Sequence, residues 1–450
     1  MDKLKTENRQ FPRISATFPI HITSEFLGKT VDLSEAGLKF ILEKPLLLSK
    51  AKAKIELSPD EVIDTEFKVI WNKHLVNDGK FTYGACFVRL KEKDLNILRK
   101  VLEQSKLLDE KFVKTTNGFR DYLTLIKDKF DRFDAKRNNE NEIINFIKSE
   151  KTEIFKKLDF YFHRTWEIVK DFSEDSYKLH KLFYQKMLDS LLIEPIEINR
   201  YIRQKPLGYS GDFITMNYIY NYNQNKYLGN SSYEKLINHY TCNIPFSTSN
   251  IIRKGFFKNK ILEILHKKED AKILIVGSGP ARELLELLNE GKIKRKITFN
   301  CLDSERKAIE YIRNEIENKY KEQSGGVGIN FLNYNMVDIL RNKQLIDKLV
   351  NQDLIYAGGI FDYLKDRFAS RLIKQLYQLL NKDSFLIICN ASSEHCSHRA
   401  YYEMLGEWVM LYRTQEEILS LTKSLCNVAA IKFEHVAEGN NYFYLSILRT

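Results

Sequence analysis

A glycine turn between an apolar run and an amphipathic run is the stretch of this sequence best suited to hold a nucleotide. The run Ile273–Val276 predicts a buried strand, Gly277-Ser278-Gly279 a tight turn, and Pro280 the start of a helix. Gly277 permits the sharp turn, and Gly279 lets a ligand lie against the backbone. The helix start offers free N–H groups and a positive dipole end. The order of strand, turn and helix is typical of nucleotide-binding folds.

An acidic residue follows at the expected distance. The run Ile297–Leu302 predicts a second strand, and it ends in Asp303. A carboxylate at this place can accept hydrogen bonds from both hydroxyls of a ribose. Turn and acid together predict a nucleoside site; the alternative is an α/β domain in which the tight turn is merely structural.

A second group of candidate residues lies near the N-terminus. Arg9 and Arg13 precede the first predicted strand, and Asp32, Ser34 and Gly37 form a turn between two strands. Guanidinium groups bind phosphate and stack on purines. A carboxylate can accept from a guanine edge, a hydroxyl can bond a phosphate, and glycine allows close approach. These residue types suit a guanine nucleotide; the alternative is a solvated basic arm and an ordinary turn.

These two motifs, RxxxR and (D/N)xSxxG, resemble those of the PilZ family, which binds the bacterial second messenger cyclic di-GMP. The resemblance covers residues 1–105, where short strands separated by turns predict a small antiparallel barrel, with helical spacing at its end. It implies a cyclic di-GMP site at the five residues named above.

Residues 106–246 show long amphipathic helical patterns and form a predicted helical linker or lid domain, which relays a signal or dimerises. Within it, residues 205–212 carry Pro, two Gly, Tyr and Asp and cannot be a helix interior. One interpretation is a lid with Tyr209 and Asp212 facing the cofactor pocket. The other is a loop in which Ser210 or Asp212 caps the next helix.

In residues 247–450, strands and helices alternate after the glycine turn, and two late runs predict closing strands. This pattern predicts a doubly wound, Rossmann-like α/β sheet that ends in an antiparallel pair. The predicted fold class is therefore multidomain, with a β-barrel, a helical segment and an α/β domain.

The third region resembles class I S-adenosylmethionine-dependent methyltransferases. The resemblance implies that S-adenosylmethionine is the cofactor, and it implies a set of cofactor-binding residues: Gly277, Ser278, Gly279, Asp303, Asn335, Met336 and Gly358. The sequence departs from the family at two places, since Ile275 replaces the usual acid and Ala281 the third glycine.

Over the last 250 residues or so, a closer resemblance connects the chain with methyltransferases of 3-hydroxypalmitic acid methyl ester biosynthesis. The segments that carry it include PLGYSGDFITMN and LIYAGGIFDYL. It implies methyl transfer to a fatty-acid carboxylate, which needs no general base. A hydroxyl or amine acceptor could use Asp362, Tyr363 or His395 as the catalytic group.

Composition and the spacing of charged residues and cysteines restrict the class of protein further. The net charge is +11 with 43% apolar residues, a bias toward anionic ligands, but no basic-aromatic stripe predicts nucleic-acid binding. The cluster of Cys389, His395, Cys396 and His398 matches no metal spacing. Without an apolar signal core, a membrane-spanning run or a CxxC pair, we expect a cytoplasmic bacterial protein.

Together these patterns predict a cyclic di-GMP-responsive methyltransferase that acts on a small-molecule or lipid-like acceptor, with homodimerisation as one option. The alternative hypothesis is a cyclic di-GMP-gated interaction scaffold whose methyltransferase-like domain is inactive, as Ile275 and Ala281 would allow.

Overall fold

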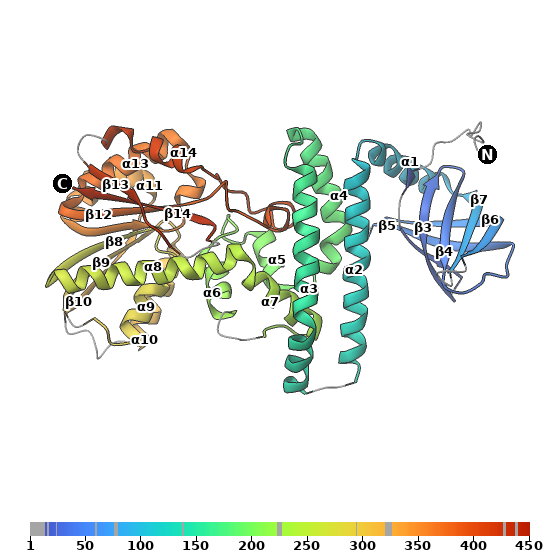
Figure 1. The fold of residues 1–450 in the computed structure, drawn as a ribbon, viewed down its shortest axis with the longest axis horizontal. Helices are drawn as coiled ribbons and strands as arrows, with labels where there is room; N and C mark the ends of the chain where they lie inside the picture. Colours follow the sequence, from blue (N-terminus) through green and yellow to red (C-terminus); the bar gives the residue numbers. More distant parts are fainter. Residues whose placement is uncertain are drawn as a thin grey trace. The chain divides into compact units, whose positions relative to one another are not determined.

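A computed structural model of the chain describes residues 14–15, 18–23, 25–58, 61–75, 80–136, 139–222, 227–293, 295–319, 326–425, 429–436 and 440–450 (Figure 1). The chain divides into two compact units. Unit 1 comprises residues 1–132 and 157–194, and unit 2 comprises residues 133–156 and 195–450. The helical segment expected over residues 106–246 is therefore shared between them, and the helix α3 (Glu140–Val169) contributes residues to both.

Unit 1 begins with a closed antiparallel barrel, which confirms the predicted fold of this region. Its strands are β1 (Ile14–Ser15), β2 (Pro19–Ile22), β3 (Phe26–Ser34), β4 (Gly37–Leu42), β5 (Lys50–Ser58), β6 (Glu61–Leu75) and β7 (Lys80–Leu90). The order is β3-β2-β5-β6-β7-β4, closed by pairing of β4 with β3, and β1 pairs outside with β3. Closure removes the exposed strand edges.

Alternating apolar residues fill the barrel. The β4 side chains Leu38, Phe40 and Leu42 are buried, as the period of two requires. The Phe40 ring stacks on Tyr83 with centroids 5.1 Å apart and meets Phe67 edge-on at 5.3 Å. Helix α1 (Glu92–Lys106) adds Leu98, Val101 and Leu102 to the same core.

The rest of unit 1 is helical. It contains α2 (Glu110–Asp134) up to residue 132, the second part of α3, and α4 (Glu174–Leu192). The buried face of α2 includes Phe112, Phe119 and Phe130 at helical spacing. Phe119 stacks on Tyr161 of α3 with centroids 4.7 Å apart, so aromatic contacts hold these helices together.

Unit 2 contains the α/β domain, preceded by α5 (Glu197–Gln204), α6 (Phe213–Tyr222), α7 (Ser232–Asn243) and α8 (Pro245–Lys267). The sheet strands are β8 (Asp270–Val276), β9 (Lys296–Asp303), β10 (Val327–Asn333), β11 (Gln352–Ala357), β12 (Leu380–Ala391), β13 (Ala429–Phe433) and β14 (Tyr442–Arg449). Their order is β10-β9-β8-β11-β12-β14-β13.

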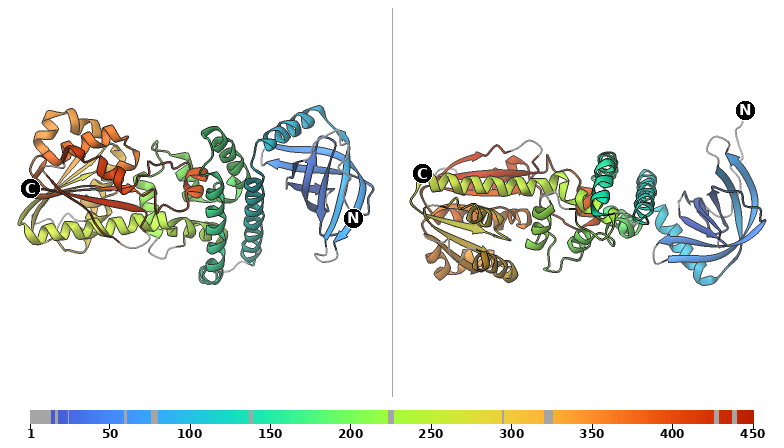
Figure 2. Two further views of the ribbon diagram at one scale, coloured as in Figure 1. Left: turned by 45° about the horizontal axis from the view of Figure 1, so that its top comes forward. Right: turned by 90° about the horizontal axis from the view of Figure 1, so that it is seen from below.

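The strands β8 to β12 are parallel, whereas β14 runs antiparallel to β12 and to β13. The helices are α9 (Arg282–Asn289), α10 (Arg306–Lys319), α11 (Met336–Arg341), α12 (Lys343–Leu349), α13 (Asp366–Gln378) and α14 (Gln415–Ser420). Helices α9 and α10 lie on one face of the sheet and α13 and α14 on the other (Figures 1 and 2).

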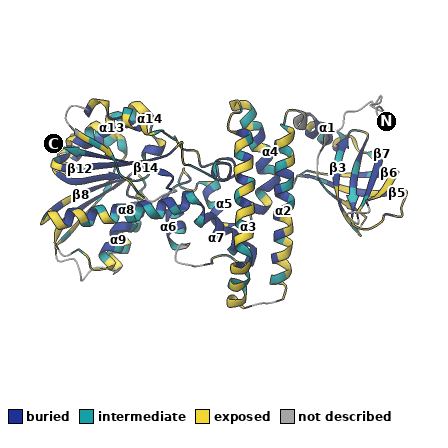
Figure 3. Ribbon diagram, viewed as in Figure 1, coloured by how far each residue is buried: buried dark blue, intermediate teal, exposed yellow. Residues whose placement is uncertain are grey.

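The central strands are buried on both faces (Figure 3), as a doubly wound sheet requires. This arrangement confirms the predicted fold class. The antiparallel strand β14, inserted beside β12, distinguishes this sheet from the dinucleotide-binding fold, in which the six strands are parallel. Among the helices that the structure describes, none is both long and apolar enough to cross a membrane.

Candidate functional site

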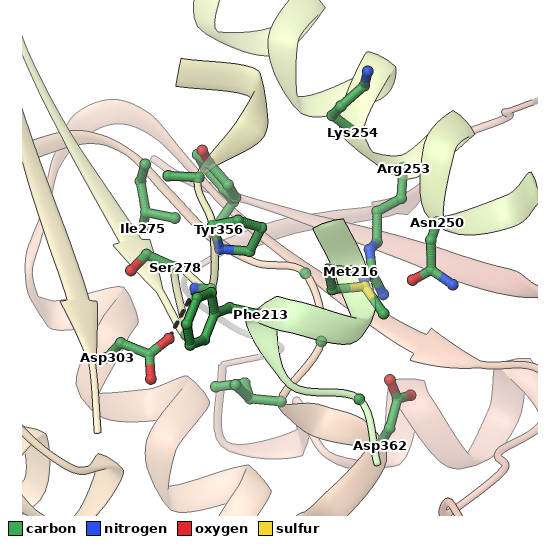
Figure 4. A pocket seen from close by; sticks show the side chains of 18 of the residues that line it. Phe213, Met216, Asn250, Arg253, Lys254, Ile275, Ser278, Asp303, Tyr356 and Asp362 are labelled. Carbon is green, nitrogen blue, oxygen red and sulfur yellow. Dashed lines mark hydrogen bonds between the residues drawn. The ribbon is translucent and has the colours of Figure 1, made fainter. Parts of the chain in front are cut away.

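A cavity of about 270 Å³ opens at the carboxyl ends of the parallel strands (Figure 4). It lies beside β8 and β11, where the strand order reverses and where ligands of such sheets bind. The turn after β8, the end of β9 and the loop after β11 line one side. Helices α6 and α8 contribute most of the other side.

The glycine turn has the conformation that its sequence suggests. Gly277 has φ +68° and Gly279 has φ +52°, both in the left-handed region. A Cβ on Gly277 would lie 2.4 Å from Ile360 Cγ2, whereas the structure places no described atom within 4 Å of a Cβ on Gly279. Gly279 therefore leaves its backbone open toward the cavity. Ala281 also has a positive φ, +43°, in the left-handed region that favours glycine.

Asp303 lies at the end of β9 and is buried. One of its oxygens accepts a hydrogen bond from Gly279 N at 2.8 Å and the other from Glu305 N at 2.9 Å. Burial raises the pKa of this carboxyl group, and the backbone donors oppose that effect. Because each carboxylate oxygen has two lone pairs, both can accept a further bond from a ligand hydroxyl.

Six of the seven predicted cofactor residues line the cavity. They are Gly277, Ser278, Gly279, Asp303, Met336 and Gly358. The seventh, Asn335, does not line it. Its side chain accepts hydrogen bonds from Val337 N and Asp338 N and so caps α11 in a capping box.

Two of the three predicted catalytic residues, Asp362 and Tyr363, also line the cavity. Tyr363 is 41% exposed, and its hydroxyl accepts a hydrogen bond from Trp408 Nε1 at 2.7 Å. His395 does not line the cavity. Its ring lies 5.6 Å from that of Phe443, and its side chain is 54% exposed.

Asp362 is almost completely buried, and its carboxylate accepts a hydrogen bond from Ala391 N at 2.6 Å. Burial raises the pKa of Asp362 to about 6, although the bond from Ala391 and the charges of Arg253 and Arg413 oppose this shift. A carboxyl group with such a pKa is suited to exchange a proton near neutral pH.

The substitution Asp362→Asn tests this shift. Because the folded-state pKa is raised above the ordinary value of 3.8, ionisation of Asp362 costs stability as pH rises through about 6. We expect the stability of the variant, relative to the unaltered chain, to increase by about 2 kcal/mol between pH 4 and pH 7. Calorimetric unfolding at several pH values measures this difference. A difference that is the same at every pH would contradict the shift.

The loop predicted as a lid or a capped turn places its two named residues differently. Tyr209 lines the cavity. Asp212 is buried and does not; its Oδ1 accepts from Ile214 N at 3.0 Å and Thr215 N at 2.9 Å, which caps α6. A Cβ on Gly211 would lie 2.6 Å from the Trp408 ring, so the loop lies directly against this side chain.

Sequence reasoning missed several polar residues of the cavity, among them Arg253, Glu283 and Tyr356. Glu283 of α9 is buried and accepts a hydrogen bond from the Tyr356 hydroxyl at 2.7 Å. Burial raises the pKa of Glu283. The sequence offered one signal for such residues: a charged side chain on the otherwise apolar, buried face of a helix. Arg253 is such a residue, since it lies among the apolar residues of α8.

The cluster of Cys389, His395, Cys396 and His398 shows no metal-binding arrangement. The Cys396 thiol contacts the Tyr402 hydroxyl at 2.7 Å, and Cys389 is buried in the sheet. Over the described part of the chain, no three His, Cys, Asp or Glu side chains gather in a way that could hold a metal ion.

In the barrel, Asp32 and Ser34 lie near the end of β3, and Gly37 begins β4. The Ser34 hydroxyl donates to the Gly37 carbonyl at 3.1 Å and so closes the turn. A Cβ on Gly37 would lie 2.2 Å from the Ala85 carbonyl oxygen, so Gly37 allows β7 to approach. The predicted Arg9 and Arg13 lie outside the described residues.

A row of residues crosses the outer face of the barrel beside this turn. Asp32 pairs with Lys39, Lys39 with Gly84, and Gly84 with Trp71 of β6. The Trp71 ring lies over Gly84, where a Cβ would be 2.2 Å from it, and Trp71 is 46% exposed. An accessible indole therefore lies over Gly84, in the same row as Asp32.

Residues 7–104 match the family model described as PilZ domain, so the chain carries a PilZ domain at its N-terminus. The match covers less than half of the chain. No curated protein is similar enough to match.

Three solved structures illustrate the structural similarities. A possible exported protein from Bordetella parapertussis has 12% identity and a TM-score of 0.41, covering 70% of this chain and 98% of its own. Magnesium protoporphyrin IX methyltransferase from Synechocystis, with bound SAM, has 12% identity and a TM-score of 0.32, covering 45% and 81%. The Bacillus subtilis inhibitor of motility MotI/DgrA has 19% identity and a TM-score of 0.21, covering 22% and 52%. Because these TM-scores are low, the fold assignment rests on the strand order.

Proposed function

We propose that this chain is a cyclic di-GMP-responsive, S-adenosylmethionine-dependent methyltransferase that acts on a small molecule, with a fatty-acid carboxylate as the first acceptor to test. One observation carries the proposal: a single cavity gathers the glycine turn after β8, the acid at the end of β9, Met336 after β10 and Gly358 after β11. Four separate strand ends thus contribute to one site of the kind that binds a nucleoside.

The residues present fit the cofactor. Asp303 would accept hydrogen bonds from the ribose hydroxyls, and the open backbone at Gly279 would allow close approach of the ligand. Three carboxyl groups, those of Asp303, Glu283 and Asp362, line the cavity and suit a ligand that carries a sulfonium and an ammonium. S-adenosylmethionine supplies a methyl group on sulfonium sulfur, which departs as a neutral thioether when the acceptor takes the methyl.

Accordingly, the protein's task is to align the acceptor and to exclude water. Tyr209, Tyr363 and Trp408 line the cavity, and both tyrosines remain partly exposed. An apolar acceptor could pack against these rings. A carboxylate acceptor needs no proton transfer; for a hydroxyl or amine, Asp362 is the candidate base. His395 is not placed for this role because it does not line the cavity.

Binding of cyclic di-GMP is proposed from the PilZ domain and from the positions of Asp32, Ser34 and Gly37 on one turn. Trp71 extends this site. Its ring shares the row of Asp32 on the outer face of the barrel, so it offers a surface on which a guanine can stack.

We expect Trp71→Leu to weaken cyclic di-GMP binding about tenfold, because base–aromatic stacking contributes about 1–3 kcal/mol per base. Gly84→Val should have a similar effect, since its side chain would displace the ring. Calorimetric titration with cyclic di-GMP measures both. Ile70→Ala, a neighbouring exposed apolar position, serves as the control. Unchanged affinity in both variants would exclude Trp71 from the site.

The methyltransferase activity is tested by incubating the complete chain with S-adenosylmethionine labelled in its methyl group, with and without cyclic di-GMP. Candidate acceptors are free fatty acids and hydroxy fatty acids. We expect labelled methyl product, formed at a rate that changes when cyclic di-GMP is present. Binding of S-adenosylmethionine without transfer to any acceptor would favour the interaction scaffold instead.

A further inference from the structure

Arg253 is a buried cation inside the cavity. It lies on the buried face of α8, in line with Phe246, Asn250 and Phe257, and is 8% exposed. Its guanidinium lies 4.7 Å from the centre of the Tyr442 ring and interacts with the phenol of Tyr220. Burial of a charge costs several kcal/mol unless the charge is paired, so such a side chain usually has a partner.

The described residues satisfy only part of the hydrogen-bonding capacity of the Arg253 guanidinium. Among the described residues, Arg253 Nη1 has no hydrogen-bond acceptor, although the atom is inaccessible to solvent. The charge of Arg253 acts on the carboxyl groups of Asp362 and Glu283, but neither of them accepts a hydrogen bond from Nη1. Ser278, in the glycine turn of the same cavity, likewise has a buried hydroxyl oxygen without a hydrogen-bond partner in the described part of the chain. Two polar atoms of one cavity, Arg253 Nη1 and Ser278 Oγ, therefore lack hydrogen-bond partners among the described residues, although the guanidinium also interacts with the Tyr220 hydroxyl.

A second buried arginine in the same unit, Arg413, has a structural role and serves for comparison. Arg413, 4% exposed, donates to the Phe361 carbonyl at 2.9 Å, to the Leu364 carbonyl and to Asn390, and pairs with Asp366 at 2.8 Å. All of these partners belong to the protein. The contrast indicates that Arg253 completes its hydrogen bonds with a ligand.

The surroundings of Arg253 fit a planar anion. Cβ atoms on Gly358 and Gly359 would lie 3.5 Å from Arg253 Nε and 3.6 Å from Nη2, so these glycines leave the guanidinium uncovered by side chains. Guanidinium binds a carboxylate through two parallel hydrogen bonds. Neighbouring Lys254 is different, because it pairs with Glu286.

The position of Arg253 in the cavity indicates whether it binds a carboxylate of the cofactor or of the acceptor. Arg253 projects from α8 on one side of the cavity and Asp303 lies on the opposite side, with Ser278 and Tyr356 between them (Figure 4). If Asp303 holds the ribose, the amino-acid end of the cofactor extends toward Arg253. An acceptor would instead enter beside the partly exposed rings of Tyr209 and Tyr363.

We infer that Arg253 binds the α-carboxylate of the methionine end of S-adenosylmethionine. This assignment rests on the proposed function. It also gives the cavity a specific recognition of the amino-acid end, although Ile275 has replaced the family's usual acid in this region.

The test compares two ligands that share the thioadenosine part. S-adenosylhomocysteine carries the amino-acid end, and 5′-methylthioadenosine lacks it. Both are titrated by calorimetry into the unaltered chain, Arg253→Met, Arg253→Lys and Lys258→Met; Lys258 is on the same helix but does not line the cavity. Arg253→Met should weaken S-adenosylhomocysteine about 10- to 100-fold and change 5′-methylthioadenosine less than threefold. Arg253→Lys should fall between, and Lys258→Met should match the unaltered chain.

Retained binding of 5′-methylthioadenosine shows that the variant is folded, so the affinity ratio isolates the carboxylate contact. A ratio that Arg253→Met leaves unchanged would overturn the inference while the proposed function stands. An equal loss of both ligands would also overturn it, because Arg253 would then support the cavity as a whole. If neither ligand binds the unaltered chain, the proposed function itself fails.

Discussion

Asp303→Asn is expected to lower the affinity for S-adenosylmethionine about 100-fold. The substitution removes the negative charge and one acceptor from the group that we propose binds the ribose hydroxyls. Hydrogen bonds to a charged group contribute about 1.5–3 kcal/mol each, and two would be weakened. The amide keeps the shape of the side chain, but its NH2 group must face either Gly279 N or Glu305 N, and the loss of that hydrogen bond costs about 1–3 kcal/mol of stability. Thermal unfolding of the variant therefore accompanies the titration.

Calorimetric titration of both proteins measures this effect. Asp270→Asn is the matched control, because Asp270 lies at the exposed start of β8 and pairs with Lys296. It should bind the cofactor as the unaltered chain does. If Asp303→Asn bound within threefold of the unaltered chain, Asp303 would not be the ribose ligand, and the nucleoside site would have to lie elsewhere.

Gly37→Ala should destabilise the barrel by about 3 kcal/mol and abolish binding of cyclic di-GMP. The added Cβ would lie 2.2 Å from the Ala85 carbonyl oxygen and 2.8 Å from Cys86 Cα. Both atoms belong to the backbone of β7, which pairs with β4 at this position, so neither can move without breaking the ladder. Overpacking of this kind costs about 1–3 kcal/mol and more when the neighbour is rigid.

Gly255→Ala provides a matched substitution with the opposite sign. Gly255 lies inside α8, and its Cβ position has no described atom within 4 Å. We expect it to stabilise the chain by about 1 kcal/mol, since alanine favours the helix. Calorimetric unfolding compares both variants. Gly37→Ala should still bind S-adenosylmethionine, because the cavity belongs to unit 2. Loss of that binding as well would contradict a local effect on the barrel.

The sequence was most informative where function depends on consecutive residues. The glycine turn and Asp303 were recognisable because their types and spacing reflect a local conformation, and the structure places both at one cavity. The alternation of strands and helices was equally local, and it predicted the sheet correctly. The order of the strands, with β14 inserted between β12 and β13, required the structure.

Residues that depend on tertiary contacts were harder to predict. Arg253 reaches the cavity from a helix that precedes the whole sheet, so no spacing relates it to Asp303. Asp212 was predicted as a lid residue or a cap and Asn335 as a cofactor residue; the same side-chain oxygens serve both purposes, and in the structure both residues cap helices. His395 follows a strand end, as site residues often do, but its loop carries it away from the cavity.

The most direct test of the central claim is a calorimetric titration of S-adenosylmethionine into the complete chain, once without and once with saturating cyclic di-GMP. A cyclic di-GMP-responsive methyltransferase should bind S-adenosylmethionine saturably, Asp303→Asn should weaken that binding, and the affinity should change when cyclic di-GMP is bound. By reciprocity, S-adenosylmethionine should then change the affinity for cyclic di-GMP by the same factor. Absence of S-adenosylmethionine binding under both conditions would contradict the account and favour the interaction scaffold.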